Sequence, residues 1–187
     1  MSCDLIGGKL EGCKSAVGGL LAVYFINFDD LDVEANATFG STHESDVITA
    51  IAAGSTTLYK FELKADANSL ETNIQASREN GTSFFNSVLN IAIKKQDTKT
   101  TKNIKLMSYG RPYCIVHTRG NQFFLMGLQQ GCDVTGGTMS AGSSLDSFVG
   151  YTVTLEANEV TPPNFLNAST ETALTALMGG AITIETT

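Results

Sequence analysis

Alternation of apolar and polar residues is the feature that most constrains how this chain can fold. Between Thr57 and Glu159 the apolar residues recur at every second position in several runs, beginning with 59–63 and 70–76. A period of two places successive side chains on opposite faces of a β-strand, so each run predicts a strand with one face on a core. The pattern therefore predicts a mainly β fold.

The first expected hairpin carries a candidate interface. An Asn-Gly pair at 80–81 predicts a tight turn, because these residues adopt positive φ at low cost, and residues 85–93 predict the returning strand. The face of this strand that lies away from the core carries Phe84, Val88 and Ala92. This face is more apolar than contact with water requires, so we expect a partner subunit to cover it.

The remaining patterns set the expected limits of the domain. We expect a single domain over residues 1–187, with its core at about 55–166, an N-terminal extension over 1–54 and a C-terminal extension over 167–187. The other expected elements are strands over 113–118 and 122–128, a strand beginning at Tyr151, strands over 20–28 and 182–184, a helix over 169–178 closed by Gly179, and an ambiguous stretch over 47–53.

A segment rich in glycine, serine and threonine separates two of the strong strands. Residues 131–150 have no regular period, which predicts an extended loop or arm instead of a regular element. Gly136, Gly137 and Gly142 allow close approach and tight bends of the backbone there. We expect the part from Asp133 to Asp146 to reach a neighbouring subunit, and these glycines are candidate interface residues.

Lysines recur at a helical spacing after the first hairpin. Lys95, Lys99, Lys102 and Lys105 lie three or four residues apart, and Asp97 can cap the helix that this spacing predicts. One interpretation is a solvated helix face. The alternative is that the first three lysines pair with acidic residues of an adjacent subunit and so set the register between copies.

Residues that usually carry catalysis or bind metal ions are few and scattered. The only two histidines are His43 and His117, and Cys114 lies three residues before His117 on a predicted strand, so the two would point to opposite faces. P-loop, dinucleotide-binding and serine-hydrolase motifs are absent from the sequence. We therefore expect no metal ion, no cofactor and no enzymatic activity.

Two further groups of residues are expected to be structural. The four cysteines, Cys3, Cys13, Cys114 and Cys132, are too scattered for a metal site, and we expect them to be reduced thiols. The acidic cluster at 29–32 lacks the spacing of a calcium-binding EF-hand loop, so we expect a solvated turn.

The charge balance limits which partners the chain can have. The net charge is −7, from 19 acidic and 12 basic residues, which argues against a protein that grips nucleic acid by neutralising phosphates. Such a balance is compatible with a surface along which DNA slides. The sequence shows no signal-peptide pattern and no apolar run of about 18 residues, so we expect neither secretion nor contact with a membrane.

Seven short segments follow one another in a characteristic order and spacing over residues 61–166, a span of a little over half of the chain. These segments are Phe61–Lys64, Ser77–Ser83, Tyr109–Pro112, Gly120–Gly127, Gly131–Gly137, Gly150–Glu156 and Pro163–Leu166. In this order and spacing the chain resembles the major tail tube proteins of tailed bacteriophages, in particular virion structural proteins of Bacteroidetes phages.

This resemblance implies an antiparallel β-sandwich or half-barrel with one flanking helix. It further implies a structural virion protein that assembles in the host cytoplasm into stacked, sixfold rings of the tail tube, the conduit for DNA ejection. Its partners would be further copies of itself, other virion tail proteins and passing DNA, which it would not bind specifically.

Two other functions stay open from the sequence. A capsid-decorating, head-completion or collar protein of the same kind of virion would share these features. A host-binding β-sandwich module is the second, but such modules commonly expose tryptophan or tyrosine platforms, whereas this chain has no tryptophan and five tyrosines.

Overall fold

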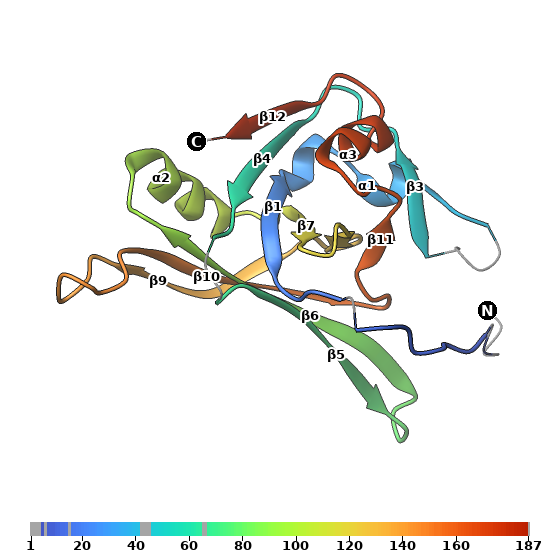
Figure 1. The fold of residues 1–187 in the computed structure, drawn as a ribbon. Coiled ribbons are helices and arrows are strands. Elements are labelled where there is room, and N and C mark those ends of the chain that lie inside the picture. Colours follow the sequence, from blue (N-terminus) through green and yellow to red (C-terminus); the bar gives the residue numbers. More distant parts are fainter. Residues whose placement is uncertain (1–4, 6, 15, 42–45, 65–66, 187) are drawn as a thin grey trace.

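The computed structural model describes residues 5, 7–14, 16–41, 46–64 and 67–186. Within these ranges the chain forms a larger and a smaller β-sheet that pack against each other (Figure 1). The larger sheet has eight described strands in the order β12-β4-β1-β7-β8-β11-β3-β2. Their bounds are β1 Leu20–Ile26, β2 Ala37–Phe39, β3 Val47–Ile51, β4 Thr57–Glu62, β7 Tyr113–Thr118, β8 Phe123–Met126, β11 Asn164–Leu166 and β12 Thr183–Thr186.

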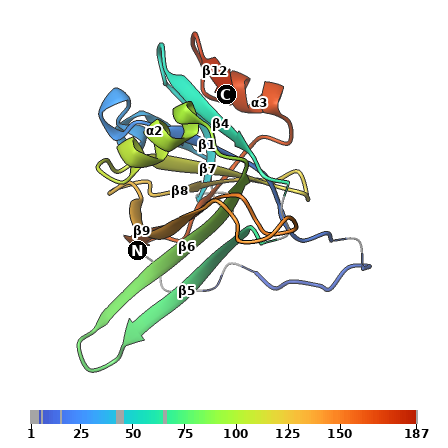
Figure 2. The same cartoon turned by 90° about the vertical axis from the view of Figure 1, so that its left-hand side faces the viewer.

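The smaller sheet has four described strands in the order β5-β6-β10-β9, and each pairs antiparallel with its neighbour. Its strands are β5 Ser69–Ser77, β6 Thr82–Lys94, β9 Asp133–Ser140 and β10 Gly150–Glu159. The 13-residue β6 is longer than the other described strands, and with β5 it forms a hairpin that projects beyond the rest of the molecule (Figures 1 and 2).

Helices begin where a side chain accepts a hydrogen bond from the first turn. Asp97 accepts from the N–H of Thr100 at 2.7 Å and begins α2 (Thr98–Met107), as its position in the sequence predicts. Thr170 caps α3 (Glu171–Leu177), and Asp32 caps the short α1 (Val33–Asn36), which follows the 3₁₀ turn η1 (Phe28–Asp30). In the described part of the chain no helix has the length and apolar character needed to cross a bilayer.

The larger sheet is buried on both faces because two apolar layers flank it. Val23 and Phe25 of β1 face the smaller sheet and α2, whereas Tyr24 and Ile26 face α3. Strands from both ends of the larger sheet contact the layer around α3, so the sheet curves around this helix. The expected mainly β sandwich with a flanking helix is therefore confirmed, although β11 pairs parallel with β3, and β12 parallel with β4.

The expectation that residues 131–150 lack regular structure is wrong for their first half. Residues 133–140 form β9, which pairs along β10. Gly137 permits this pairing, since a Cβ there would lie 2.6 Å from the backbone oxygen of Thr152. Regular backbone hydrogen bonds to β10 thus override the low strand propensity of glycine, and only 141–149 remain as an irregular connection.

The buried core also extends beyond the limits expected from the alternating pattern. Residues 20–26 lie at the centre of the larger sheet, and Leu174, Leu177 and Met178 pack against its concave face. Both sets belong to the segments that were expected as extensions. The apolar runs in these two segments are short, and burial on two faces leaves no polar residues to alternate with apolar ones. The alternating pattern therefore does not reveal them.

Candidate functional site

The face of the smaller sheet that points away from the larger sheet is polar and extends over four described strands. Alternate residues of β6 and β10, such as Leu89 and Leu155, point into the core, so the residues between them point outward. The described strand residues of this outward face are mainly amides and hydroxyls: Ser69, Asn73, Gln75, Ser77, Thr82, Asn86, Asn90, Thr138, Thr152, Thr154 and Asn158.

Neighbouring side chains on the outward face hydrogen-bond to one another across the strands. Asn86 Nδ2 donates to Asn158 Oδ1 at 2.8 Å, and Thr154 Oγ1 donates to Asn90 Oδ1 at 2.8 Å. The hydroxyls of Thr138 and Thr152 lie 2.7 Å apart. These contacts occupy polar groups that would otherwise be available to a ligand, and they fix the side chains relative to one another.

The charges on the outward face are mostly negative. Glu71 and Glu156 stand on either side of Val88 in the strand register, and Asp133 pairs with Glu156. Of the described strand residues on this face, Lys94 alone is basic, and it stands at the very end of β6. A phosphate backbone that passed over this face would meet amides, hydroxyls and carboxylates, with little to neutralise its charge.

The candidate residues Phe84, Val88 and Ala92 lie on this outward face, but they do not form one apolar patch. The side chain of Phe84 is 40% exposed, Val88 is half-buried, and Ala92 is 7% exposed. Ala92 is covered by its own chain, where its N–H donates to Asn68 Oδ1 at 2.6 Å. Phe84 and Val88 thus remain accessible to a partner, and Ala92 does not.

Two open edges border the smaller sheet. In the described chain β5 and β9 each pair on one side only, which leaves the backbone groups of the other side without a strand partner. Isolated proteins usually protect such edges with lysine, proline or a very short strand. Neither β5 nor β9 contains lysine, arginine or proline, and Gly136 of β9 has open space around its Cβ position.

The lysines of α2 lie on the other side of the smaller sheet from the outward face. Ile104 and Met107 of α2 pack in the layer between the two sheets, and the hydroxyl of Tyr151 lies 2.6 Å from that of Thr101. Lys99 and Lys102 are exposed on the free side of the helix. Lys95, in the connection from β6, is also exposed and has a positive φ of 66°. The sheet therefore separates these cations from the polar surface.

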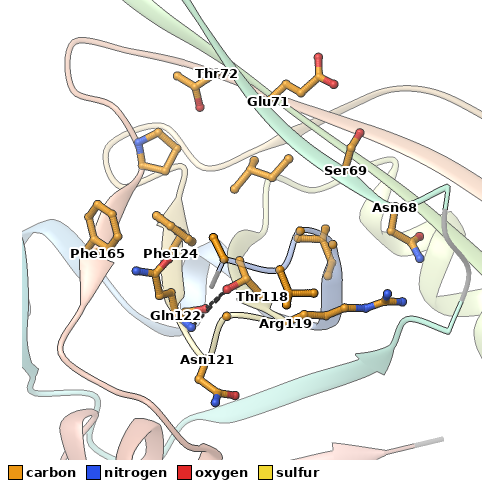
Figure 3. Close-up of a pocket in the computed structure, with 18 of the residues that line it drawn as sticks. Asn68, Ser69, Glu71, Thr72, Thr118, Arg119, Asn121, Gln122, Phe124 and Phe165 are labelled. Atoms are coloured by element: carbon orange, nitrogen blue, oxygen red, sulfur yellow. Dashed lines mark hydrogen bonds between the residues drawn. The ribbon is translucent and has the colours of Figure 1, made fainter. Parts of the chain in front are cut away.

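A wide groove opens beside the smaller sheet (Figure 3). It has a volume of about 940 Å³ and is lined by residues 16–20, 68–72, 118–122 and 162–165, together with Asp46 and Phe124. The rings of Phe124 and Phe165 meet there with centroids 4.5 Å apart. Its titratable groups are Asp46, Glu71 and Arg119, and its described lining residues include neither cysteine nor histidine.

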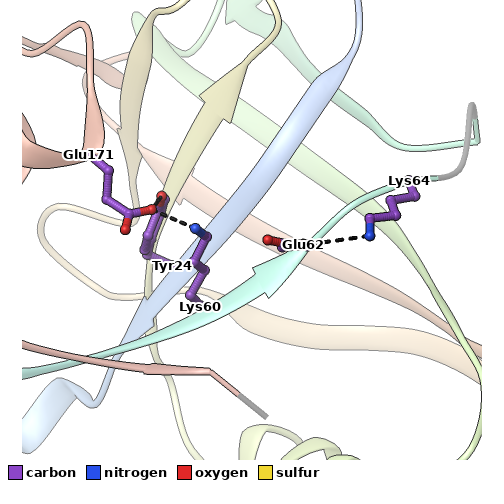
Figure 4. A network of polar contacts seen from close by, with 5 residues as sticks. All are labelled: Tyr24, Lys60, Glu62, Lys64 and Glu171. Atoms are coloured by element: carbon purple, nitrogen blue, oxygen red, sulfur yellow. Dashed lines mark hydrogen bonds and ion pairs between the residues drawn. The ribbon is translucent and has the colours of Figure 1, made fainter.

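A polar network joins the larger sheet to α3 (Figure 4). Tyr24 Oη donates to Glu171 Oε2 at 2.6 Å, and Lys60 Nζ lies 2.6 Å from the same oxygen. Burial, followed by the hydrogen bond to Glu171, raises the pKa of Tyr24, while the hydrogen bond from Lys60 lowers the pKa of Glu171. Both shifts move the groups away from neutral pH, which makes them poor proton donors and acceptors.

His117 and the cysteines also lack the arrangement of a catalytic site. Cys114 faces the smaller sheet, whereas His117 stacks on Phe123 of the opposite layer at 4.0 Å between ring centroids, so the prediction of opposite faces is confirmed. Burial raises the pKa of the Cys132 thiol. Cys13 is exposed and Cys114 is a buried free thiol, while Cys3 and His43 lie outside the described residues.

The acidic residues after β1 have local structural roles. Asp32 Oδ1 accepts from the N–H of Ala35 at 3.0 Å, and Asp30 Oδ2 accepts from Asn27 Nδ2 at 2.8 Å. The bond to Asp30 lies in the acidic turn that the sequence predicts, and the bond to Asp32 caps α1, which the sequence did not predict. Among the residues that the structure describes, no three histidine, cysteine, aspartate or glutamate side chains lie close enough to bind a metal ion.

One feature that the sequence did not reveal is a cradle of backbone amides around Glu159. The N–H groups of Leu128, Gln129 and Gln130 point at its carboxylate, at 3.1, 2.6 and 3.3 Å. The Glu159 side chain is 7% exposed. Gly127 and Gly131, both with positive φ, lie at the two ends of this turn. These two glycines are the sequence signal that could have indicated it.

Comparisons with known protein families, curated proteins and solved structures find no match to this chain. The functional argument therefore depends on the surfaces described above.

Proposed function

We propose that this chain is a structural virion subunit that self-assembles into stacked rings and so forms the tail tube of a tailed bacteriophage. The observation that carries the proposal is the smaller sheet, which combines two open edges with an outward face of amides, hydroxyls and carboxylates. The sequence resemblance to tail tube proteins supports the same function.

The strand directions of the smaller sheet suit head-to-tail joining of copies. Because all three pairings are antiparallel, β5 and β9 at the two edges run in opposite directions. When β9 of one copy lies beside β5 of the next, the new pair is again antiparallel. The same step can repeat without any change of pattern, and a ring closes when the rotation per copy divides a full turn.

The chemistry of the outward face suits the inner surface of such a ring. DNA carries about one negative charge per 1.7 Å, and a protein binds it mainly by neutralising these charges with lysine and arginine. Glu71 and Glu156 flank β6 on this face, and Lys94 stands only at the end of that strand. Such a face would bind DNA weakly. DNA can therefore pass along the bore, as ejection requires.

Electron microscopy of the purified protein over a range of concentrations tests this proposal. We expect rings or tubes with an open central channel, formed without nucleic acid. We also expect the assembled particles to show negligible binding of duplex DNA at physiological salt. A protein that stays monomeric at millimolar concentration would contradict self-assembly, and tight, salt-sensitive DNA binding would contradict the role of the bore.

A further inference from the structure

The connection between β9 and β10 presents one fully exposed leucine. Leu145 lies near the middle of residues 141–149 and has a relative exposure of 110%, and the connection projects from the body of the molecule in Figure 1. An apolar side chain that touches none of its own chain gains nothing in the isolated subunit, where it only exposes apolar surface to water.

Serine hydroxyls hold this tip in a defined shape. Ser144 N donates to Ser147 Oγ at 3.0 Å, and Ser147 N donates to the backbone oxygen of Ser144 at 3.1 Å. Gly142, with a φ of 79°, makes the bend that begins the turn, and Ser147 and Val149 would lie 3.2 Å from a Cβ there. Leu145 is thus a pre-ordered knob, which lowers the entropy lost when it binds.

An aromatic pocket of about 370 Å³ lies elsewhere on the same chain, between η1, β1, β4 and the last turn of α2. Its apolar walls come from Phe25, Phe28, Tyr59, Phe61, Leu106 and Met107. Leu106 is 55% exposed, so part of this apolar wall faces water in the isolated subunit. The pocket is large enough for a leucine side chain.

The charges around the knob and the pocket are complementary. Asp146 follows Leu145 directly, and the pocket is bordered by Arg111, whose guanidinium carbon lies 4.9 Å from the centre of the Phe28 ring. Lys99 and Lys102 lie one helical turn before Asn103 and Leu106, which line the pocket, so they flank it on the exposed side of α2.

The opposite side of the pocket is acidic, with Asp29 and Asp30. Asp30 already accepts a hydrogen bond from Asn27. A bound Asp146 would therefore lie toward α2 and Arg111, and this preference fixes the orientation of the incoming turn.

We propose that Leu145 of one copy inserts into the aromatic pocket of a second copy, with Asp146 beside Arg111 and the α2 lysines. The inference rests on the proposed self-assembly and adds a second head-to-tail contact to that of the sheet edges. A knob and a pocket at different places on one chain form a heterologous contact, the type that builds rings and filaments.

Site-specific photocrosslinking tests the contact directly. A benzophenone amino acid replaces Leu145 in a one-to-one mixture of ¹⁴N- and ¹⁵N-labelled protein at high concentration, and crosslinked peptides are identified by mass spectrometry. We expect mixed-label crosslinks to 25–30, 59–61 or 103–112. Crosslinks that are absent, or that map to other segments, would overturn the inference.

Variants separate this contact from the proposed function as a whole. Leu145→Asp should raise the protein concentration needed for assembly about tenfold, which corresponds to roughly 1.4 kcal/mol, while Leu10→Asp, at a leucine that is 95% exposed, should have no effect. Asp146→Lys should also weaken assembly, and Lys102→Asp in the same chain should restore part of it.

The outcomes distinguish the two claims. If the wild type assembles and Leu145→Asp assembles equally well, the knob contact is wrong and the tube function stands. If the wild type never assembles, both are wrong. Circular dichroism and cooperative thermal unfolding of each variant show that a loss of assembly does not come from unfolding.

Discussion

Replacing Glu159 by Gln tests how far a single buried carboxylate stabilises the turn at 127–131. A glutamine side chain has one acceptor oxygen in place of two, so at least one of the three amides around Glu159 is left unpaired. We expect a loss of about 1–3 kcal/mol in the free energy of unfolding, measured by urea denaturation. Glu156→Gln is the control, because Glu156 is less buried and accepts from the Thr135 hydroxyl, and it should change stability by less than about 0.5 kcal/mol.

His117 makes stability depend on pH in a predictable direction. Burial, followed by the nearby Lys60, lowers the pKa of His117 below its usual value of 6.5, and Glu171 opposes this shift. The unfolded chain therefore binds the proton more readily, so the stabilisation is complete above pH 6.5 and is lost as the pH falls through the folded-state pKa.

The comparison of wild type with His117→Gln isolates this effect. Urea unfolding at pH 7.5, 6.5 and 5.5 should show a steeper decline in the free energy of unfolding for the wild type than for the variant. Equal slopes for the two proteins over this range would contradict the assignment.

At the scale of single residues, the sequence predicts local roles better than distant ones. The cap at Asp97 follows from a spacing of three residues, and the turn at Asn121, with a φ of 56°, follows from its Gly-Asn pair. The amides that bind Glu159 lie about 30 residues before it in the sequence and belong to the backbone. No pattern of side chains in the sequence therefore predicts this contact.

The open edge of β9 is the element most directly testable for its role in assembly. Gly136→Lys adds a long charged side chain where nothing lies within 4 Å of the Cβ position, so the subunit should fold normally. A lysine on an edge strand opposes pairing with another strand, and we expect a shift from rings to monomers in sedimentation velocity experiments.

Gly12→Lys is the matched control for this edge variant. Gly12 also has open space around it and lies outside the sheets, so the same change of charge should leave assembly intact. If Gly136→Lys assembled like Gly12→Lys, pairing through β9 would be wrong.

At the scale of elements, alternation predicts a strand well when one face is buried and the other is wet. β10 follows this rule, with Tyr151, Val153 and Leu155 buried and the residues between them half-buried. The structure also confirms the strands expected at β4, β5, β6 and β7, although β7 is buried on both faces and β5 is mostly exposed. Alternation does not predict β9, because Gly136 and Gly137 interrupt its sequence of apolar residues. In addition, β9 forms by pairing with β10, which follows it in the chain. β3 was ambiguous since its five residues are too few to separate two periods.

For the whole molecule, the distribution of charge should decide whether DNA slides or binds. Asn73→Lys, Thr138→Lys and Asn158→Lys together change the net charge from −7 to −4 and place three cations on the outward face. We expect assembled particles of this variant to retain short duplex DNA at about 50 mM salt and to release it at about 200 mM.

A second variant separates the place of the charges from their number. Lysines at Gly7, Gly8 and Gly12, which have open surroundings, give the same net charge away from the sheet. These particles should not retain DNA. Equal retention by both variants would show that net charge matters and that the outward face is not the bore.

For the whole molecule, the sequence does not predict the arrangement on which the proposed function depends. Charge balance and the absence of catalytic motifs narrow the class of protein, but the proposed ring depends on which strands are left at the edges of a sheet. That order, β5-β6-β10-β9, is set by long-range pairings that no local pattern contains.

The length of β6 has a consequence for the dimensions of the proposed tube. Its 13 residues, at about 3.4 Å each, span about 44 Å. Strands in closed barrels tilt by about 35–45° from the axis, so β6 would cover about 31–36 Å along a tube. If successive rings of the proposed tube meet end to end, this length is the axial repeat, and the length of the tube would be set by the number of rings, each adding the height of one strand.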